Sequence, residues 1–219
     1  GIPDYQLIVK AIELYTESKE AMEDAIIRRN EFNFKTESAR KRFLAAVNST
    51  FLNFQNKDHE ELITNLFTHQ VSLETQQLIL FWQFSFSNRL FFEISRDVFI
   101  KNYFSGRVSF AKEDIVAYIK DLASNTPELK DKFTDITINT IASKYLTVLK
   151  KLDLIDGRQK KTFKHIQVSN EALVIFIHLL KAIDPRDSDI LKSKYITLSM
   201  VSTESFSERV KQLAKKDFF

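Results

Sequence analysis

Residues 137–168 constrain the fold most, because a helical repeat is followed there by an alternating one. Thr137 is a plausible N-cap, and the apolar spacing after it predicts a helix from Ile138 to Leu152. Asp156-Gly157 then forms a turn signal, and residues 162–168 alternate between two faces with the period of a strand. We therefore predict a helix followed by a β-hairpin. The side chains expected to point inward from the helix are Ile141, Tyr145, Val148, Leu149 and Leu152.

The opposite face of this helix carries short hydrogen-bonding side chains and ammonium groups. Such groups can reach base edges and phosphates when a helix lies in a major groove. From residue 140 to residue 168, seven Lys or Arg outnumber two Asp, which gives a local net charge of +5 against +3 for the whole chain. Much of this charge falls at the tip of the hairpin. The candidate nucleic-acid contacts are Asn139, Thr140, Ser143, Lys144, Thr147, Lys151, Arg158, Lys160, Lys161 and Lys164.

Two further helices are expected upstream of this pair of elements. One runs from Lys112 to Ala123, and a short one from Pro127 to Phe133 opens with a Thr126 cap and proline in the first helical position. Three helices followed by a hairpin are typical of a winged helix-turn-helix. The same pattern also fits a purely structural element whose lysines keep its surface hydrated, or a protein-docking module. We favour nucleic-acid binding.

The N-terminal part of the chain shows a second basic helix. Helices are expected over Asp4–Thr16 and Lys19–Arg29, a third begins after a Thr36 cap, and a fourth begins with Asp58 as its cap. The third helix has a basic cluster in its first turns, so the first three helices have the outline of a helix-turn-helix. A solvated helix face is an equally typical use of such a cluster. The basic cluster is Arg40, Lys41 and Arg42.

The rest of the chain is expected to be helical too, because three glycines and three prolines leave few helix breakers among 219 residues. The predicted fold class is mainly α: a multi-helix protein with an N-terminal helix-turn-helix-like bundle and a C-terminal winged helix-turn-helix carrying a small β-hairpin. Four segments are expected. They are an N-terminal three-helix unit over 1–56, central aromatic-rich helices over 57–106, the winged helix over 107–170 and C-terminal helices over 171–219.

The composition argues against catalysis. So few glycines exclude a phosphate-binding glycine loop, and the absence of cysteine excludes disulfides, thiolate nucleophiles and cysteine metal sites. The four histidines are scattered among different elements. We therefore expect no enzyme activity, cofactor, metal or small-molecule substrate. With no run long enough to span a membrane and no secretory signal, a cytoplasmic location is expected.

Four blocks of sequence, in this order, resemble the BrxA family of BREX bacteriophage-exclusion systems. The blocks are YQLIVKAIELYTE, FNFKTESARKRFLAAVNSTF, LILFWQFSFSNRLFFEISRDVFI and TINTIASKYLTVLKKLDLIDGR. The resemblance extends to about Val168. It implies a cytoplasmic, all-helical protein with winged-helix-like parts that binds double-stranded DNA beside a methyltransferase and other BREX subunits, with no catalytic activity of its own. In the family's arginine-rich N-terminal block, Arg40, Lys41 and Arg42 are the counterparts here.

Two other functions remain open from the residues themselves. The aromatic middle helices and the winged helix could dock protein partners as a scaffold within a larger defence complex. A helical bundle could also bind RNA. Binding that is retained at high salt would favour a scaffold, because hydrophobic docking is little screened by salt. A preference for single strands or hairpins would favour RNA.

Overall fold

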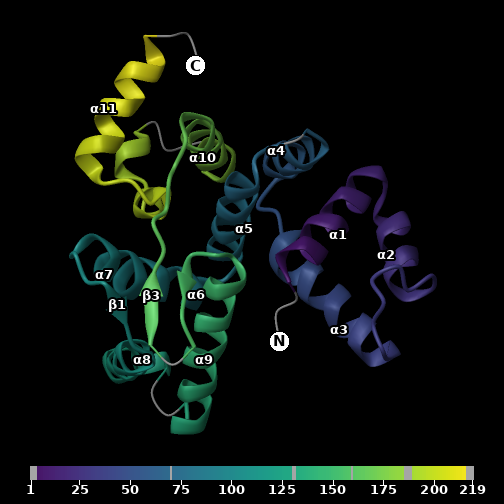
Figure 1. The fold of residues 1–219 in the computed structure, drawn as a ribbon, viewed down its shortest axis with the longest axis horizontal. Coiled ribbons are helices and arrows are strands. Elements are labelled where there is room, and N and C mark those ends of the chain that lie inside the picture. The colour runs from purple at the N-terminus through teal and green to yellow at the C-terminus, as the bar shows by residue number, and fades with distance from the viewer. Residues whose placement is uncertain (1–3, 70, 130–131, 159, 185–188, 216–219) are drawn as a thin grey trace. The chain divides into compact units, whose positions relative to one another are not determined.

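The structure is a computed structural model that describes residues 4–69, 71–129, 132–158, 160–184 and 189–215. The described part is mainly helical with one small sheet, as the sequence predicts. Contacts divide the chain into two compact units (Figure 1). The hairpin unit comprises residues 88–166, and the helical unit comprises the described residues before 88 and after 166. The four segments expected from the sequence are a different division of the chain and stay a prediction.

Most elements of the helical unit begin at a side-chain cap. Ser18, Thr36 and Ser169 accept hydrogen bonds from the backbone N–H groups three residues ahead of them. The predicted Asp58 cap is wrong: Asn56 accepts from the backbone N–H of His59 at 2.9 Å, so that helix begins two residues earlier. The elements are α1 (Tyr5–Glu17), α2 (Lys19–Ile27), α3 (Glu37–Ala46), the π-helical η1 (Val47–Phe51), α4 (Lys57–Thr68), α5 (Leu73–Ser87), α10 (Asn170–Ile183), the 3₁₀ turns η4 (Ile190–Lys192) and η5 (Ile196–Ser199), and α11 (Thr203–Ala214).

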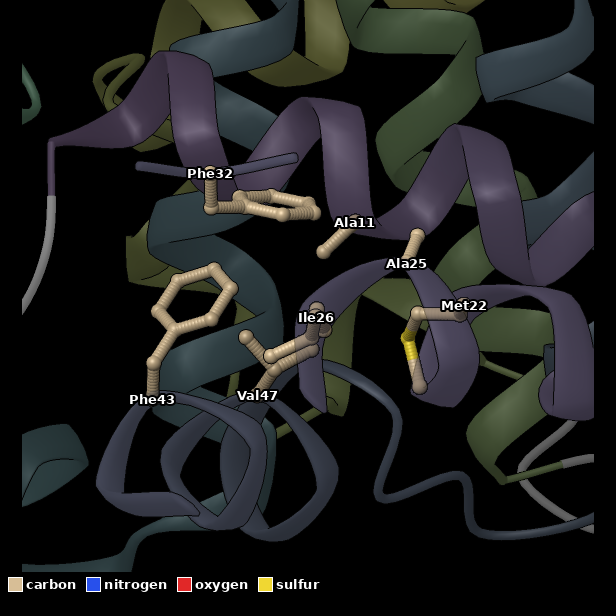
Figure 2. Packing of buried hydrophobic residues seen from close by; sticks show 7 residues of the cluster. All are labelled: Ala11, Met22, Ala25, Ile26, Phe32, Phe43 and Val47. Atoms are coloured by element: carbon tan, nitrogen blue, oxygen red, sulfur yellow. The ribbon is translucent and has the colours of Figure 1, made fainter. Parts of the chain in front are cut away.

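The first three helices enclose a small apolar cluster, which Figure 2 shows from close by. Phe32, in the loop between α2 and α3, meets Phe43 of α3 with ring centroids 5.2 Å apart. Because small residues of α1 and α2 lie opposite these rings, the helices can approach closely around them. The cluster consists of Ala11, Met22, Ala25, Ile26, Phe32, Phe43 and Val47.

Helix α5 carries fully buried aromatic residues. Trp82 is fully buried, and its indole Nε1–H donates to the backbone oxygen of Leu198 at 2.8 Å. Its ring lies 4.9 Å from that of Phe176 on α10, which in turn meets Phe206 on α11. These contacts attach the C-terminal elements to α5.

No helix among the described residues is long and apolar enough to cross a membrane.

A hydrogen-bonded histidine joins α4 to α5. The Nδ1 of fully buried His59 accepts from the backbone N–H of Gln55 at 3.3 Å, so its Nε2–H donates to Gln83 at 2.8 Å. The side-chain amide of Gln83 in turn donates to the backbone oxygen of Phe51 at 3.0 Å. Burial lowers the pKa of His59, which keeps the ring neutral. Within the described ranges, no three metal-binding side chains lie together.

The hairpin unit combines helices with a three-stranded sheet. Its strands are antiparallel in the order β1-β3-β2, with Ser109 opposite Thr162 and Ile155 opposite Phe163. Helix α9 packs against β2 and against α8 (Figure 1). The elements are α6 (Arg89–Ile94), the π-helical η2 (Ser95–Ile100), α7 (Lys101–Phe104), β1 (Ser109–Phe110), α8 (Lys112–Asn125), the 3₁₀ turn η3 (Pro127–Leu129), α9 (Asp135–Lys151), β2 (Ile155–Asp156) and β3 (Lys161–Phe163).

The predicted helix and hairpin are present, but the strand expected over residues 162–168 is only β3, because its pairing with β1 and β2 ends at Phe163. Two further corrections concern the start of the predicted helix and the segment before it. The expected helix from Pro127 to Phe133 is a 3₁₀ turn of three residues, and residues 130–131 lie outside the described chain. This segment has too few apolar residues for a helical stripe, and short helices depend on such packing. The cap of α9 is Thr134 and not Thr137: the Thr134 hydroxyl oxygen accepts from the backbone N–H of Thr137 at 3.2 Å.

The buried histidine makes the stability of the helical unit depend on pH. Unfolded His59 takes up a proton near the ordinary pKa of 6.5, whereas the folded residue does so only at lower pH. We predict that the free energy of unfolding is highest above pH 6.5 and falls as the pH is lowered below it. In His59→Gln this fall should be shallower. Urea denaturation at pH values from about 5 to about 8 measures it.

His178 supplies the matched comparison, because burial lowers the pKa of this histidine too. His178→Gln should remove a separate and smaller part of the pH dependence, because this side chain is less enclosed. A His59→Gln protein whose stability falls with decreasing pH as steeply as that of the wild type would contradict the assignment.

Candidate nucleic-acid interface

Helix α9 has a buried face and an exposed face, as its sequence repeat predicts. Of the expected inward side chains, Tyr145, Val148, Leu149 and Leu152 are buried and Ile141 is half-buried. The structure adds three buried residues that the predicted stripe left out: Ile138, Ala142 and Leu146. With this many apolar contacts on one side, the rotation of α9 about its own axis is fixed, and so is the identity of its exposed residues.

Tyr145 links the buried face of α9 to the helices that precede it. Its hydroxyl lies 3.0 Å from the Oγ of Ser95, and both residues are buried. Its ring packs 5.1 Å from that of Phe91 on α6. Burial raises the pKa of Tyr145, so the hydroxyl stays protonated and able to hydrogen-bond. Tyr145 thus holds α9 in place by apolar packing and by a buried hydrogen bond.

The exposed face of α9 borders an open groove of about 560 Å³. Five side chains predicted from the sequence line it together, all of them from one side of the helix. The structure adds Lys112 from α8, which sequence spacing alone could not bring to α9. It also adds Ile136, four residues before Thr140 and therefore on the same face. The groove is lined by Lys112, Asp135, Ile136, Asn139, Thr140, Ser143, Lys144 and Thr147.

The short polar side chains of this face are bonded back to their own helix. The hydroxyls of Thr140, Ser143 and Thr147 each donate to the backbone oxygen four residues earlier, at 2.8, 2.9 and 2.9 Å. The side-chain amide of Asn139 does the same at 2.9 Å. Since each hydroxyl has only one proton, these residues present oxygen lone pairs and, in the threonines, methyl groups to the groove.

Two lysines bring positive charge to the groove. Exposed Lys144 lies along α9, and half-buried Lys112 reaches in from α8. Asp135 is the one acidic residue of the lining, and its carboxylate is paired with Lys120 at 2.8 Å. Lys151 occupies the last turn of α9, outside the groove lining. The groove is therefore lined by hydrogen-bonding side chains and two ammonium groups, a combination that suits an anionic polymer.

Two of the four predicted hairpin cations are engaged inside the hairpin. Lys161 donates to the backbone oxygens of Gly157 and Arg158 at 3.0 and 2.5 Å, and Lys164 pairs with Asp153 at 2.5 Å. Gly157 has φ +94°, and a Cβ there would lie 2.0 Å from the Lys160 oxygen, so the turn requires glycine. Arg158 and Lys160 remain exposed at the tip.

The basic cluster of α3 is divided in the same way. Half-buried Arg40 donates from Nη1 to the backbone oxygen of Ile27 at 2.5 Å, so it closes the end of α2. Its Nε is buried without a hydrogen-bond partner among the described residues. Lys41 and Arg42 are exposed and line a shallow depression of about 470 Å³, where Lys41 pairs with Glu37 at 2.6 Å. Successive helix positions diverge by about 100°, which separates Arg40 from its neighbours.

Comparison with known proteins identifies one family. The family model of BrxA matches residues 5–177, which is more than half of the chain. The match includes the basic helix α3, the groove of α9 and the hairpin. No curated protein and no solved structure matches.

The role of Tyr145 in holding α9 predicts a graded loss of stability. Tyr145→Phe removes one buried hydrogen bond and should lower the free energy of unfolding by about 1 kcal/mol. Tyr145→Ala also removes the ring and should cost about 3–5 kcal/mol. Thr147→Ala, on the exposed face of the same helix, should change stability by less than about 0.5 kcal/mol. Urea denaturation followed by circular dichroism measures all three, and similar losses for Tyr145→Ala and Thr147→Ala would contradict the assigned faces.

Proposed function

The chain belongs to the BrxA family and is thus a component of a BREX phage-defence system, and we propose that it acts there by binding double-stranded DNA without catalysing a reaction. The observation that carries the proposal is the polar groove of α9 lying next to a hairpin with exposed cations. The ammonium of Lys150, near the end of α9, donates to Gly157 of the hairpin turn at 3.3 Å. The helix and the hairpin therefore form one continuous surface within the hairpin unit.

The order of elements in the hairpin unit supports a winged helix. A helical segment (α6, η2 and α7), β1, α8, α9 and the β2–β3 hairpin follow one another, and β1 completes the sheet. In helix-turn-helix proteins the recognition helix lies in the major groove with its N-terminal residues at the base edges. In this scheme α9 is the recognition helix. Helix α8 is then the helix before it, a place that the sequence assigned to residues 127–133.

The residues of this surface divide naturally into two kinds of contact. Lys112 and Lys144 of the groove and exposed Arg158 and Lys160 would contact phosphates, which supply affinity without regard to sequence. Asn139 and the hydroxyl-bearing residues of α9 would face base edges. Lys161 and Lys164 instead hold the hairpin in shape through their own hydrogen bonds. Lys41 and Arg42 of α3 form a second candidate DNA contact on the helical unit.

The groove chemistry supports a binding role without catalysis. A serine or threonine becomes a nucleophile when an adjacent base accepts its proton. The hydroxyls of Thr140, Ser143 and Thr147 donate instead to backbone oxygens of the helix. Asp135, the carboxylate of the lining, is paired with Lys120. We propose that the protein acts in the cytoplasm beside other BREX subunits, which would supply any chemistry on DNA.

Binding to duplex DNA should be strongly salt-dependent. With about four phosphate contacts, the slope of log K against log salt should be about −3.6. Arg158→Glu/Lys160→Glu should bind at least about tenfold more weakly and reduce the slope by about 2 in magnitude. Fluorescence anisotropy with a labelled random duplex across a salt series measures both. The matched control is Lys211→Glu/Lys215→Glu, which makes the same change of charge at exposed positions at the C-terminal end of the described chain.

Each alternative function gives a different result in this experiment. No binding to the duplex even at low salt would contradict the proposal and favour a protein-docking scaffold. Binding that prefers single strands or RNA hairpins would favour RNA. A loss of affinity as large in the control variant as in the hairpin variant would show that only net charge matters.

A parallel variant tests the second basic surface. Lys41→Glu/Arg42→Glu should weaken binding about as much as the hairpin variant if the helical unit also contacts phosphates, and should leave it unchanged if α9 and the hairpin act alone. We expect a measurable loss, because both side chains are exposed on one helix face. Lys41→Gln/Arg42→Gln separates the loss of contacts from the introduction of like charge.

A further inference from the structure

Ile136 is an apolar side chain in a polar groove. It lines the groove of α9 and is 81% exposed, more than any other large apolar residue of the described chain. A β-branched side chain in a helix has essentially one χ1 rotamer, so α9 sets the direction in which the Ile136 side chain points. The side chain is thus held out toward whatever enters the groove, at the N-terminal end of the helix.

Thr140 and Asn139, which line the groove next to Ile136, add further groups that can contact a ligand. The hydroxyl of Thr140 donates to the backbone oxygen of Ile136 itself at 2.8 Å, which leaves the threonine methyl group available for contact. One amide proton of Asn139 is used on its own helix at 2.9 Å. Its oxygen and its second amide proton remain available. This end of the groove therefore offers apolar contact, one acceptor and one donor.

We propose, on the premise that the protein binds duplex DNA, that this end of the groove reads an A·T base pair, with Ile136 against the 5-methyl group of thymine. Of the four bases, only thymine presents a methyl group in the major groove. Adenine presents a donor and an acceptor that match the free amide groups of Asn139. Guanine presents two acceptors and would need donors. Asn139 has only one amide proton left, and the ammonium groups of Lys112 and Lys144 are assigned to phosphates.

Replacing thymine by uracil tests the contact directly, because uracil lacks only the methyl group. Anisotropy titrations compare an alternating dA-dT duplex with the same duplex containing deoxyuridine. Wild-type protein should bind the uracil duplex about fourfold more weakly, the factor for one buried methyl group. Ile136→Ala should bind both duplexes equally, and Ile136→Val should retain most of the preference. The exposure of Ile136 and the high helix propensity of alanine leave the fold intact.

The outcomes separate this inference from the proposed function. Equal binding of the wild-type protein to the thymine and uracil duplexes would overturn the methyl contact and leave DNA binding standing. A thymine preference that persists in Ile136→Ala would overturn the role of Ile136. Absence of binding to either duplex at low salt would overturn DNA binding itself. Loss of the preference in Ile136→Ala, with salt-dependent binding retained, supports both.

Discussion

The packing of Tyr145 against Phe91 and Ser95 is the contact on which the candidate interface depends. It joins an apolar ring contact to a buried hydrogen bond, and together these fix the rotation of α9. Once that rotation is fixed, helical geometry decides which residues face solvent: positions 136, 140, 143 and 147 recur at three- and four-residue intervals along one side. The buried contacts of α9 therefore determine which of its residues line the groove on the opposite face.

The parts of the fold that could be predicted from the sequence are those with local causes. The repeat of apolar residues in α9 and the Asp156-Gly157 turn are such features, and both appear in the structure. Strand β1 could not be predicted, because two residues, Ser109 and Phe110, carry no period and pair with a strand far along the chain. The cap of α9 was misplaced by three residues because Thr134 and Thr137 have the same capping chemistry, and only backbone geometry separates them.

The candidate site shows where residue type stops being informative. Lys160 and Lys161 are neighbours of the same kind, but Lys161 is bound to backbone oxygens of the turn, whereas Lys160 is exposed. Arg40 is likewise taken up by the oxygen of Ile27, while Arg42 faces solvent. A charge count treats these as equals, because the acceptors that engage them belong to main chain whose position follows from the fold. The sequence could indicate a basic surface, but not which of its cationic side chains are exposed and which are hydrogen-bonded to the main chain.

In the proposed complex the exposed face of α9 lies in the major groove of DNA, and a single introduced cysteine can locate it there. The chain has no cysteine, so Ser143→Cys creates a unique thiol on that face. Duplexes carrying a disulfide-reactive tether on a base edge in either groove would be incubated with this protein, and with Ser205→Cys on α11 as a control. Cross-linking of position 143 to the major-groove tether alone is the predicted result. Equal cross-linking from position 205, or preferential cross-linking to the minor groove, would contradict the claim.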